Sequence, residues 1–316
     1  MIAFGPVPSR RLGNSLGINH VKPKYCTYSC IYCQVGRTTH LRTTRMKFYS
    51  LPEILQEVET KISESTKAGR VIDYLTLVPD GEPLLDLHLK ELIEGLISFG
   101  LPIAVISNGS LVNRQDVQEG LLLADWISFK VDAVTESDWH KIDRPHRSLS
   151  LPAILTGMLN YRNRYQGEFV TETMLVSGIN DSESSIYQLC AFLNELKPMK
   201  SYLSIPTRPP AEFWVKPPEL DSLQKVIHII DTCNINMDFL FGFEGTDFQS
   251  TGNITDDILG ITAVHPIRED ALRELVSKVH ADWSIVEELI AMGKIYRIQF
   301  RDEWFYVHRF KKPNSN

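Results

Sequence analysis

Cysteine is scarce in this sequence, which has only five among 316 residues. So few cysteines do not form the disulfide framework of a small secreted protein. The chain also lacks any run of about 18 apolar residues, and its first residues, Met1 to Arg11, lack the apolar stretch of an export signal. Positive charge is not in excess, because 33 lysines and arginines stand against 39 aspartates and glutamates, a formal net charge of -6. We therefore predict a cytoplasmic protein with no membrane partner and no general attraction for polyanions.

Most of the chain alternates short, β-rich apolar runs with longer amphipathic segments, which is typical of parallel strands joined by helices. We predict six strands, at Ser15–Val21, Ile72–Val78, Ile103–Ser107, Trp126–Val131, Phe169–Val176 and Tyr202–Ile205. We predict five helices between them, at Pro52–Lys67, Leu87–Phe99, Gln115–Leu122, Pro152–Tyr165 and Ser182–Leu196. This pattern predicts an α/β fold, a partial (β/α)6 barrel of the TIM type.

The pattern changes toward the C-terminus. After the proline-rich segment Pro206–Pro218 we expect a further helix and strand, then a turn-rich stretch, at Leu220–Asp231, Ile235–Phe241 and Gly242–Gly252. Two more helices and a hairpin are predicted at Pro266–His280, Ser284–Met292, Ile295–Phe300 and Trp304–His308. Two helices followed by a hairpin resemble a winged helix-turn-helix. We divide the chain into a barrel domain, residues 1–245, and a winged-helix-like domain, residues 255–316.

Three of the five cysteines, Cys26, Cys30 and Cys33, fall within eight positions. Thiolates suit iron–sulfur clusters, and an ordinary [4Fe–4S] cluster takes four of them, so three would leave one iron open. The alternative is a zinc site with His20 or His40 as the fourth ligand, but neither histidine has the close spacing usual in zinc sites. The other two cysteines are interpreted as small core residues.

Polar residues follow the predicted strands, at the end where barrel enzymes build their sites. The segments Asp80–Pro83 and Ser107–Ser110 follow the second and third strands, although the first is also an ordinary turn sequence. Ser128, Lys130 and Asp132 alternate along the fourth strand and therefore share one face. They are either ligand contacts or part of a buried ion pair. In the fifth strand, Glu172 either faces the cavity or pairs with Lys130.

The motifs CxxxCxxC, Gly81-Glu82-Pro83 and Ser107-Asn108-Gly109 occur in the order typical of the radical S-adenosylmethionine (radical SAM) superfamily. The chain resembles that superfamily from Ile2 to Phe241. The resemblance implies one [4Fe–4S] cluster on Cys26, Cys30 and Cys33. It also implies the S-adenosylmethionine (SAM) contacts Tyr32, Gly81, Glu82, Pro83, Asn108, Ser128, Lys130, Asp132 and Ile205. Gly81 and Glu82 would face the methionine amino group, and the backbone near Ile205 would lie beside the adenine.

The implied enzyme is an iron–sulfur protein of the oxidoreductase or lyase type. It would cleave SAM reductively to methionine and a 5'-deoxyadenosyl radical that abstracts hydrogen from a substrate. A reductant such as flavodoxin or ferredoxin is the implied partner, and the cofactors carry the chemistry.

Within the superfamily, Phe4–Gly17, Arg144–His146 and Thr171–Val176 resemble the group related to wyosine-tRNA synthetases. Those enzymes condense pyruvate carbons onto a modified guanosine in tRNA and use a second cluster on three further cysteines. This sequence has no cysteine before Cys26, so the resemblance implies the cofactor chemistry rather than the wyosine reaction.

Candidate substrate contacts are the basic residues beside the motifs, Arg10, Arg11, Arg144, His146 and Arg208. Arginine favours carboxylate and phosphate, so they suit an anionic substrate; alternatively they are surface residues of stiff loops. In the winged-helix-like domain, Glu287 and Glu288 make the second helix poor for phosphate. Positive charge is expected on the hairpin and tail, at Arg297, Arg301, Arg309, Lys311 and Lys312.

Three hypotheses follow. The first is a radical SAM enzyme with an undefined substrate, and the second narrows it to a tRNA-modifying enzyme. The third is a non-enzymatic, metal-containing regulator that binds DNA through the winged helix. The C-terminal domain would dock tRNA, or a peptide or protein substrate, or cover the barrel as a lid.

Overall fold

The computed structural model describes residues 2–240, 253–264, 266–300 and 303–308. Within these residues the main sheet has eight strands in the order β1-β2-β5-β6-β7-β8-β9-β10. Their bounds are Ala3–Ser9 (β1), Gly13–Ile18 (β2), Tyr74–Leu77 (β5), Ile103–Ser107 (β6), Trp126–Lys130 (β7), Glu168–Met174 (β8), Lys200–Ser204 (β9) and Met237–Leu240 (β10). Strands β1 and β2 are antiparallel, and every other neighbouring pair is parallel. The predicted α/β fold with a parallel sheet is confirmed.

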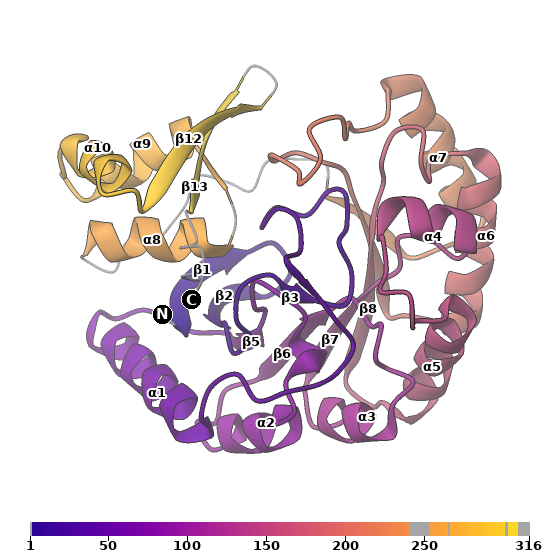
Figure 1. The fold of residues 1–316 in the computed structure, drawn as a ribbon, viewed down its shortest axis with the longest axis horizontal. Coiled ribbons are helices and arrows are strands. Elements are labelled where there is room, and N and C mark those ends of the chain that lie inside the picture. Colours follow the sequence, from indigo (N-terminus) through magenta and orange to yellow (C-terminus); the bar gives the residue numbers. More distant parts are fainter. Residues whose placement is uncertain (1, 241–252, 265, 301–302, 309–316) are drawn as a thin grey trace.

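Helices join the parallel strands and form an arc outside the sheet (Figure 1). They are α1 (Leu51–Lys67), α2 (Leu89–Ile97), α3 (Gln115–Leu121), α4 (Glu136–Ile142), α5 (Leu151–Arg164), α6 (Glu183–Leu196) and α7 (Leu220–Thr232). Helix α1 begins where Ser50 accepts a hydrogen bond from the Glu53 backbone and Pro52 occupies the first turn. In the main sheet, at least one helix therefore lies between each parallel strand and the next, from β2 to β10.

Alternation along the strands separates an apolar outer face from an inner face that carries both polar and apolar side chains. Outward residues such as Leu75, Val105 and Ile127 are fully buried and belong to the core cluster formed with the helices. Inward residues include Ser15 and Thr76, whose hydroxyls lie 2.6 Å apart. The sheet curves far enough that β1 and β10, its two edges, line the same cavity. The curved sheet thus surrounds a cavity lined by both polar and apolar side chains, and the apolar core lies outside it.

The first strand was not predicted. The segment Ala3–Ser9 contains Pro6 and Pro8, and proline cannot donate to a neighbouring strand. Proline is tolerated here because β1 is an edge strand, which only the assembled sheet reveals. Helix α4 was also missed.

The C-terminal part has its own sheet, with strand order β11-β13-β12. Its elements are α8 (Ile254–Val264), β11 (Ile267–Arg268), α9 (Glu269–Lys278), α10 (Ser284–Ala291), β12 (Ile295–Phe300) and β13 (Glu303–His308). Helix α8 was not predicted, and the helix expected from Pro266 begins at Glu269, because the residues before it pair with β13. The predicted domain boundary at residue 245, and residues 309–316 with Arg309, Lys311 and Lys312, lie outside the described residues, as does Arg301.

No helix in the described parts of the chain is long and apolar enough to cross a membrane.

Candidate functional site: a three-cysteine loop above a basic cavity

The three clustered cysteines lie in the long connection between β2 and α1. Two short strands, β3 (Tyr25–Cys26) and β4 (His40–Leu41), pair within this connection. The end of α4 and the segment after it hold this connection from the other side. Ile31 N donates to the Ile142 carbonyl at 2.9 Å, and His146 N donates to the Thr27 carbonyl at 2.9 Å. The cysteine loop is therefore fixed by backbone hydrogen bonds to a segment more than a hundred residues away in sequence.

The three thiols are partly buried neighbours. Burial raises the pKa of Cys26, Cys30 and Cys33. The thiols also raise one another's pKa, Cys33 acting on Cys26 and both of these acting on Cys30. A thiolate here is unfavourable unless a cation compensates it, and a bound metal centre does so by deprotonating its thiols outright.

Neither of the two histidines considered as a fourth zinc ligand, His20 and His40, is placed to bind zinc together with the cysteines. His20 is fully buried, and its ring nitrogens lie 3.4 Å from the carbonyls of Ile18 and Pro83. The His40 ring stacks on the Tyr25 ring at 4.1 Å. Within the described residues, no three His, Cys, Asp or Glu side chains gather as the ligands of a single metal ion do. The irons of a cubane are separate atoms, so its thiolates need not converge on one point.

The inward-facing side chains of β7 and of Asp132 just after it contact the cysteine loop. The Tyr32 hydroxyl donates to Asp132, whose other oxygen accepts from Met174 N at 2.6 Å. Lys130 Nζ lies 3.8 Å from Asp132 Oδ1 and 3.2 Å from Glu172 Oε1. Ser128 Oγ is buried and has no hydrogen-bond partner among the described residues.

Glu82 connects the ends of β5 and β6. Its buried carboxylate accepts hydrogen bonds from Ser107 Oγ at 2.6 Å, and from Leu84 N and Asn108 N at 3.0 Å each. Burial raises its pKa to about 7, although these hydrogen bonds oppose the shift. The Asn108 amide reaches the cysteine loop at Thr27 Oγ1, 2.8 Å away. Pro83 begins the short helix η1 (Pro83–Leu85).

Gly81 lies against the backbone of the cysteine loop. A Cβ added there would be 2.2 Å from the Tyr25 carbonyl oxygen, which also accepts from Glu82 N at 2.9 Å. Glycine is required for this close approach of two loops.

We expect Gly81→Ala to destabilise the fold by about 1–3 kcal/mol, the usual cost of overpacking. Urea unfolding measures it. The matched control is Gly260→Ala in α8, where the nearest atom to the new Cβ would be 3.9 Å away and no loss is expected. Equal stability of the Gly81 variant and wild type would contradict the contact.

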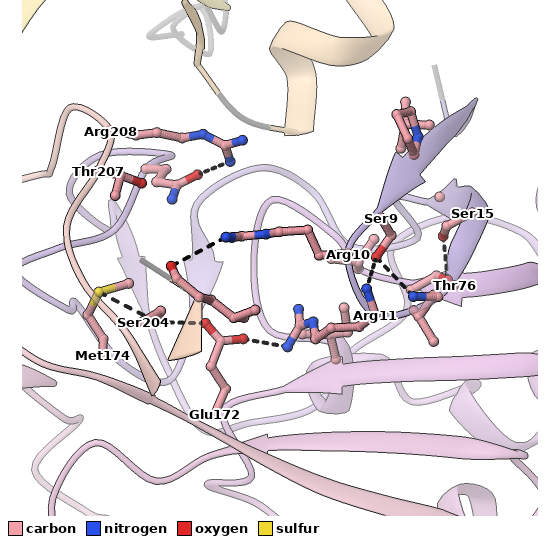
Figure 2. A pocket seen from close by; sticks show the side chains of 18 of the residues that line it. Ser9, Arg10, Arg11, Ser15, Thr76, Glu172, Met174, Ser204, Thr207 and Arg208 are labelled. Atoms are coloured by element: carbon pink, nitrogen blue, oxygen red, sulfur yellow. Dashed lines mark hydrogen bonds and ion pairs between the residues drawn. The ribbon is translucent and has the colours of Figure 1, made fainter. Parts of the chain in front are cut away.

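A cavity of about 230 Å³ lies inside the curved sheet (Figure 2). Four of the predicted site residues line it: Arg10, Arg11, Ile205 and Arg208. Glu172 and Gln34 line it as well. The structure thus brings three of the candidate arginines to one space.

Residues 21–190 match the sequence model of the Radical SAM superfamily. The chain belongs to the radical SAM superfamily. It also belongs to the UPF0026 family, because a UPF0026 protein of Methanocaldococcus jannaschii is 44% identical over 317 residues, covering 100% of this chain and 98% of that protein. Members of the radical SAM superfamily are enzymes that typically bind a [4Fe–4S] cluster and SAM.

A solved structure agrees with the fold of this radical SAM enzyme. A radical SAM methyltransferase from Sphaerobacter thermophilus aligns with TM-score 0.54 and 14% identity, over 73% of this chain and 67% of that one. A structure of TYW1 with a lysine-pyruvate adduct bound aligns with TM-score 0.44 and 14% identity, over 92% and 79%. The first likeness concerns the fold alone, and the second is too low to support any argument.

The remaining two candidates, Arg144 and His146, do not line the cavity. Arg144 pairs with Glu212, which also pairs with Arg37 at 2.7 Å and donates its backbone N–H to the Ile31 carbonyl at 3.0 Å. His146 Nδ1 lies 2.9 Å from Ser148 Oγ. In this radical SAM enzyme both residues belong to the segment that holds the cysteine loop.

Sequence patterns missed two residues of the site. Cys30 Sγ donates to the Asp143 carboxylate at 3.2 Å, and Asp143 directly precedes the Arg144-Pro-His146 motif, so its neighbourhood was a usable signal. Glu212 gave no local signal, because it stands in a proline-rich segment with no periodic pattern.

Proposed function

We propose that this radical SAM enzyme holds a single [4Fe–4S] cluster on Cys26, Cys30 and Cys33 and binds SAM beside it. The observation that carries the proposal is the group of three neighbouring, partly buried thiols on the loop after β2. The buried Ser128 Oγ without a partner among the described residues adds support, since such a hydroxyl is costly unless a ligand bonds it.

The positions of the two remaining cysteines, Cys190 and Cys233, support a single cluster. Cys190 is buried in α6, Cys233 caps α7, and both belong to one apolar cluster outside the sheet. Two cysteines packed in that cluster do not provide a second set of three ligands. This supports one cluster and argues against the two-cluster wyosine reaction.

The SAM contacts are proposed along the loop and the carboxyl ends of the strands, at Tyr32, Gly81, Glu82, Pro83, Asn108, Ser128, Lys130, Asp132 and Ile205. When bound, the cluster and SAM supply reductive cleavage to methionine and a 5'-deoxyadenosyl radical. The protein's own residues orient and shield this chemistry. Asp132 accepts a hydrogen bond from Tyr32, the residue before Cys33, and Lys130 Nζ lies 5.0 Å from the centre of the Tyr32 ring. These contacts hold Lys130, Asp132 and the cysteine loop in position relative to one another.

The C-terminal part is proposed to be a winged helix that docks the substrate. The order helix, strand, two helices and hairpin, with β11 added beside β13, supports it. Arg297 on the hairpin pairs with Glu269 at 2.6 Å and stacks on Trp304, which leaves its charge compensated. The described part of this unit therefore favours a peptide or protein over tRNA.

Anaerobic reconstitution with iron and sulfide tests the proposal. We expect a brown protein with visible absorption, and release of 5'-deoxyadenosine from SAM when dithionite or reduced flavodoxin is added. A colourless protein that leaves SAM intact under reducing conditions would refute it.

A further inference from the structure

The proline-rich segment Pro206–Pro218 contacts the cysteine loop at Glu212. The backbone N–H of Glu212 donates to the Ile31 carbonyl at 3.0 Å, and Ile31 N donates to the Ile142 carbonyl at 2.9 Å. Ile31 directly follows Cys30 and is fully buried. The peptide groups in the middle of the cysteine motif are therefore held from two sides, by segments that are far away in sequence.

The Glu212 side chain connects the same segments through charge. One carboxylate oxygen accepts from Arg37 Nη2 at 2.7 Å, and the other accepts from Arg144 Nη1. Arg37 belongs to the cysteine loop, and Arg144 belongs to the segment after α4. The side chain of Glu212 is 4% exposed, whereas those of Arg37 and Arg144 are 70% and 42% exposed. A buried carboxylate thus forms a bridge between two arginines that reach the solvent.

The aromatic residues that follow Glu212 contribute little to this attachment. Phe213 is 91% exposed, and Trp214 is exposed as well. The proline-rich segment reaches the cysteine loop at a second point, where Arg208 donates to Gln34 Oε1 at 3.2 Å. Polar contacts, rather than the two aromatic rings, therefore attach the segment to the loop.

Arg144 has a backbone conformation that is unfavourable for a residue with a Cβ. Its φ is +44°, in the left-handed region, and such strain persists only where the surrounding contacts over-determine it. Ser29 N donates to the carbonyls of Asp143 and Arg144, at 2.9 and 3.2 Å. In this conformation Asp143 contacts the thiol of Cys30 while Arg144 contacts Glu212. The ion pair with Glu212 is therefore one of the contacts that hold the strained turn beside the cysteines.

We propose that Glu212 is a positioning residue of the cluster site, which holds the cysteine loop against the proline-rich segment and the segment after α4. The proposal rests on the proposed function, because its consequence is retention of the cluster. Thiolates that share a cubane must keep their relative positions, and contacts that orient such ligands are costly to lose. Without the charge of Glu212, the loop opens more often and a bound cluster loses iron faster.

Hydrogen exchange of the full-length protein without iron tests the loop itself. Glu212→Gln removes the charge and keeps the size of the side chain. Mass spectrometry of peptides from the cysteine loop should show exchange about tenfold faster or more, which corresponds to the loss of a hydrogen bond to a charged group. Exchange in β6, inside the main sheet, should not change. Unchanged exchange in the loop, or equal acceleration in β6, would overturn the proposal.

Release of iron from the reconstituted protein to a ferrous chelator, without oxygen, tests retention of the cluster. Glu212→Gln should release iron several-fold faster than wild type. Arg37→Gln should have a smaller effect, because Arg144 still pairs with Glu212. Adding Arg37→Gln to Glu212→Gln should then change the rate little further, since both changes break the same contact. Fully additive effects would contradict the bridge.

Glu219→Gln is the matched control for these measurements. Glu219 is an exposed glutamate at the start of α7, and its side chain makes no capping hydrogen bond. Neither loop exchange nor iron release should change in this variant. If Glu212→Gln fails to fold by circular dichroism, Arg37→Gln decides, and wild-type exchange and iron release in that variant would overturn the proposal.

The two proposals fail separately. Wild-type protein that holds a cluster and cleaves SAM, with a folded Glu212→Gln variant indistinguishable from it, loses only the positioning role of Glu212. Protein that binds no cluster, but whose cysteine loop exchanges faster in Glu212→Gln, loses only the cluster assignment of its cysteines.

Discussion

Replacing Cys30 with alanine is expected to abolish both the visible absorption of the reconstituted protein and the release of 5'-deoxyadenosine. Two thiolates cannot hold the three irons that the Cys26-Cys30-Cys33 set would ligate. Cys30 is the middle cysteine of the set, and its Sγ lies 3.2 Å from the Asp143 carboxylate, so the variant tests the centre of the site. Iron and sulfide content, the absorption spectrum and chromatography of 5'-deoxyadenosine measure the outcome.

Cys190→Ala is the control for this variant. Cys190 is equally a thiol and is buried, but it lies in α6 with the apolar cluster outside the sheet. We expect full cluster content and full SAM cleavage, with at most a small loss of stability. A Cys30 variant with normal iron content, or a Cys190 variant without iron, would refute the assigned ligands.

Replacing Glu172 with glutamine is expected to lower the free energy of unfolding by about 3–5 kcal/mol, because it leaves buried cations without their counter-charge. Arg11 loses its partner at 2.5 Å, and among the described residues Lys130 keeps only the ion pair with Asp132, at 3.8 Å. Urea unfolding followed by circular dichroism measures the loss. The control is Asp238→Asn, which breaks an exposed pair with Lys200 and should cost at most about 1 kcal/mol.

The same variant has a signature in pH. Burial by itself raises the pKa of Glu172, but Lys130 and Arg11 outweigh it and hold the pKa below its ordinary value of 4.5. A carboxyl group with a lowered pKa contributes stability fully above 4.5 and loses it as the pH falls below that value. Wild type should therefore lose stability below pH 4.5 more steeply than the glutamine variant. Equal slopes, with equal stability at pH 7, would show that the ion pair contributes nothing.

Much of the fold could be predicted because it depends on residues close in sequence. Alternating apolar runs marked the parallel strands from β5 to β9, and proline and serine marked the start of α1. The edge strand β1 could not be found in this way, because two prolines argue against a strand unless its place at the edge is known. Helix α8 was missed too, although it packs on β1 and joins the second core.

In the candidate site, too, some features could be predicted from the sequence and others only from the tertiary structure. The sequence placed Ser128, Lys130 and Asp132 on one strand face, which follows from the two-residue period of a strand. It left open whether Lys130 binds a ligand or an ion-pair partner, and the structure places it between Asp132 and Glu172. The sequence grouped Arg144 with the cavity arginines, whereas the structure pairs it with Glu212 beside the cysteine loop.

The sequence by itself determined the superfamily, the spacing of the three clustered cysteines and the alternation of strands and helices. These properties depend on spacing within a short segment, where covalent geometry limits how far the side chains can separate. Only the tertiary structure decided which arginines share a cavity, what holds the cysteine loop and why Gly81 cannot carry a side chain. Those outcomes depend on pairs such as Arg11 with Glu172, 161 positions apart, which no local pattern links. They form because burial inside the curved sheet makes an unpaired charge costly and selects a partner from anywhere in the chain.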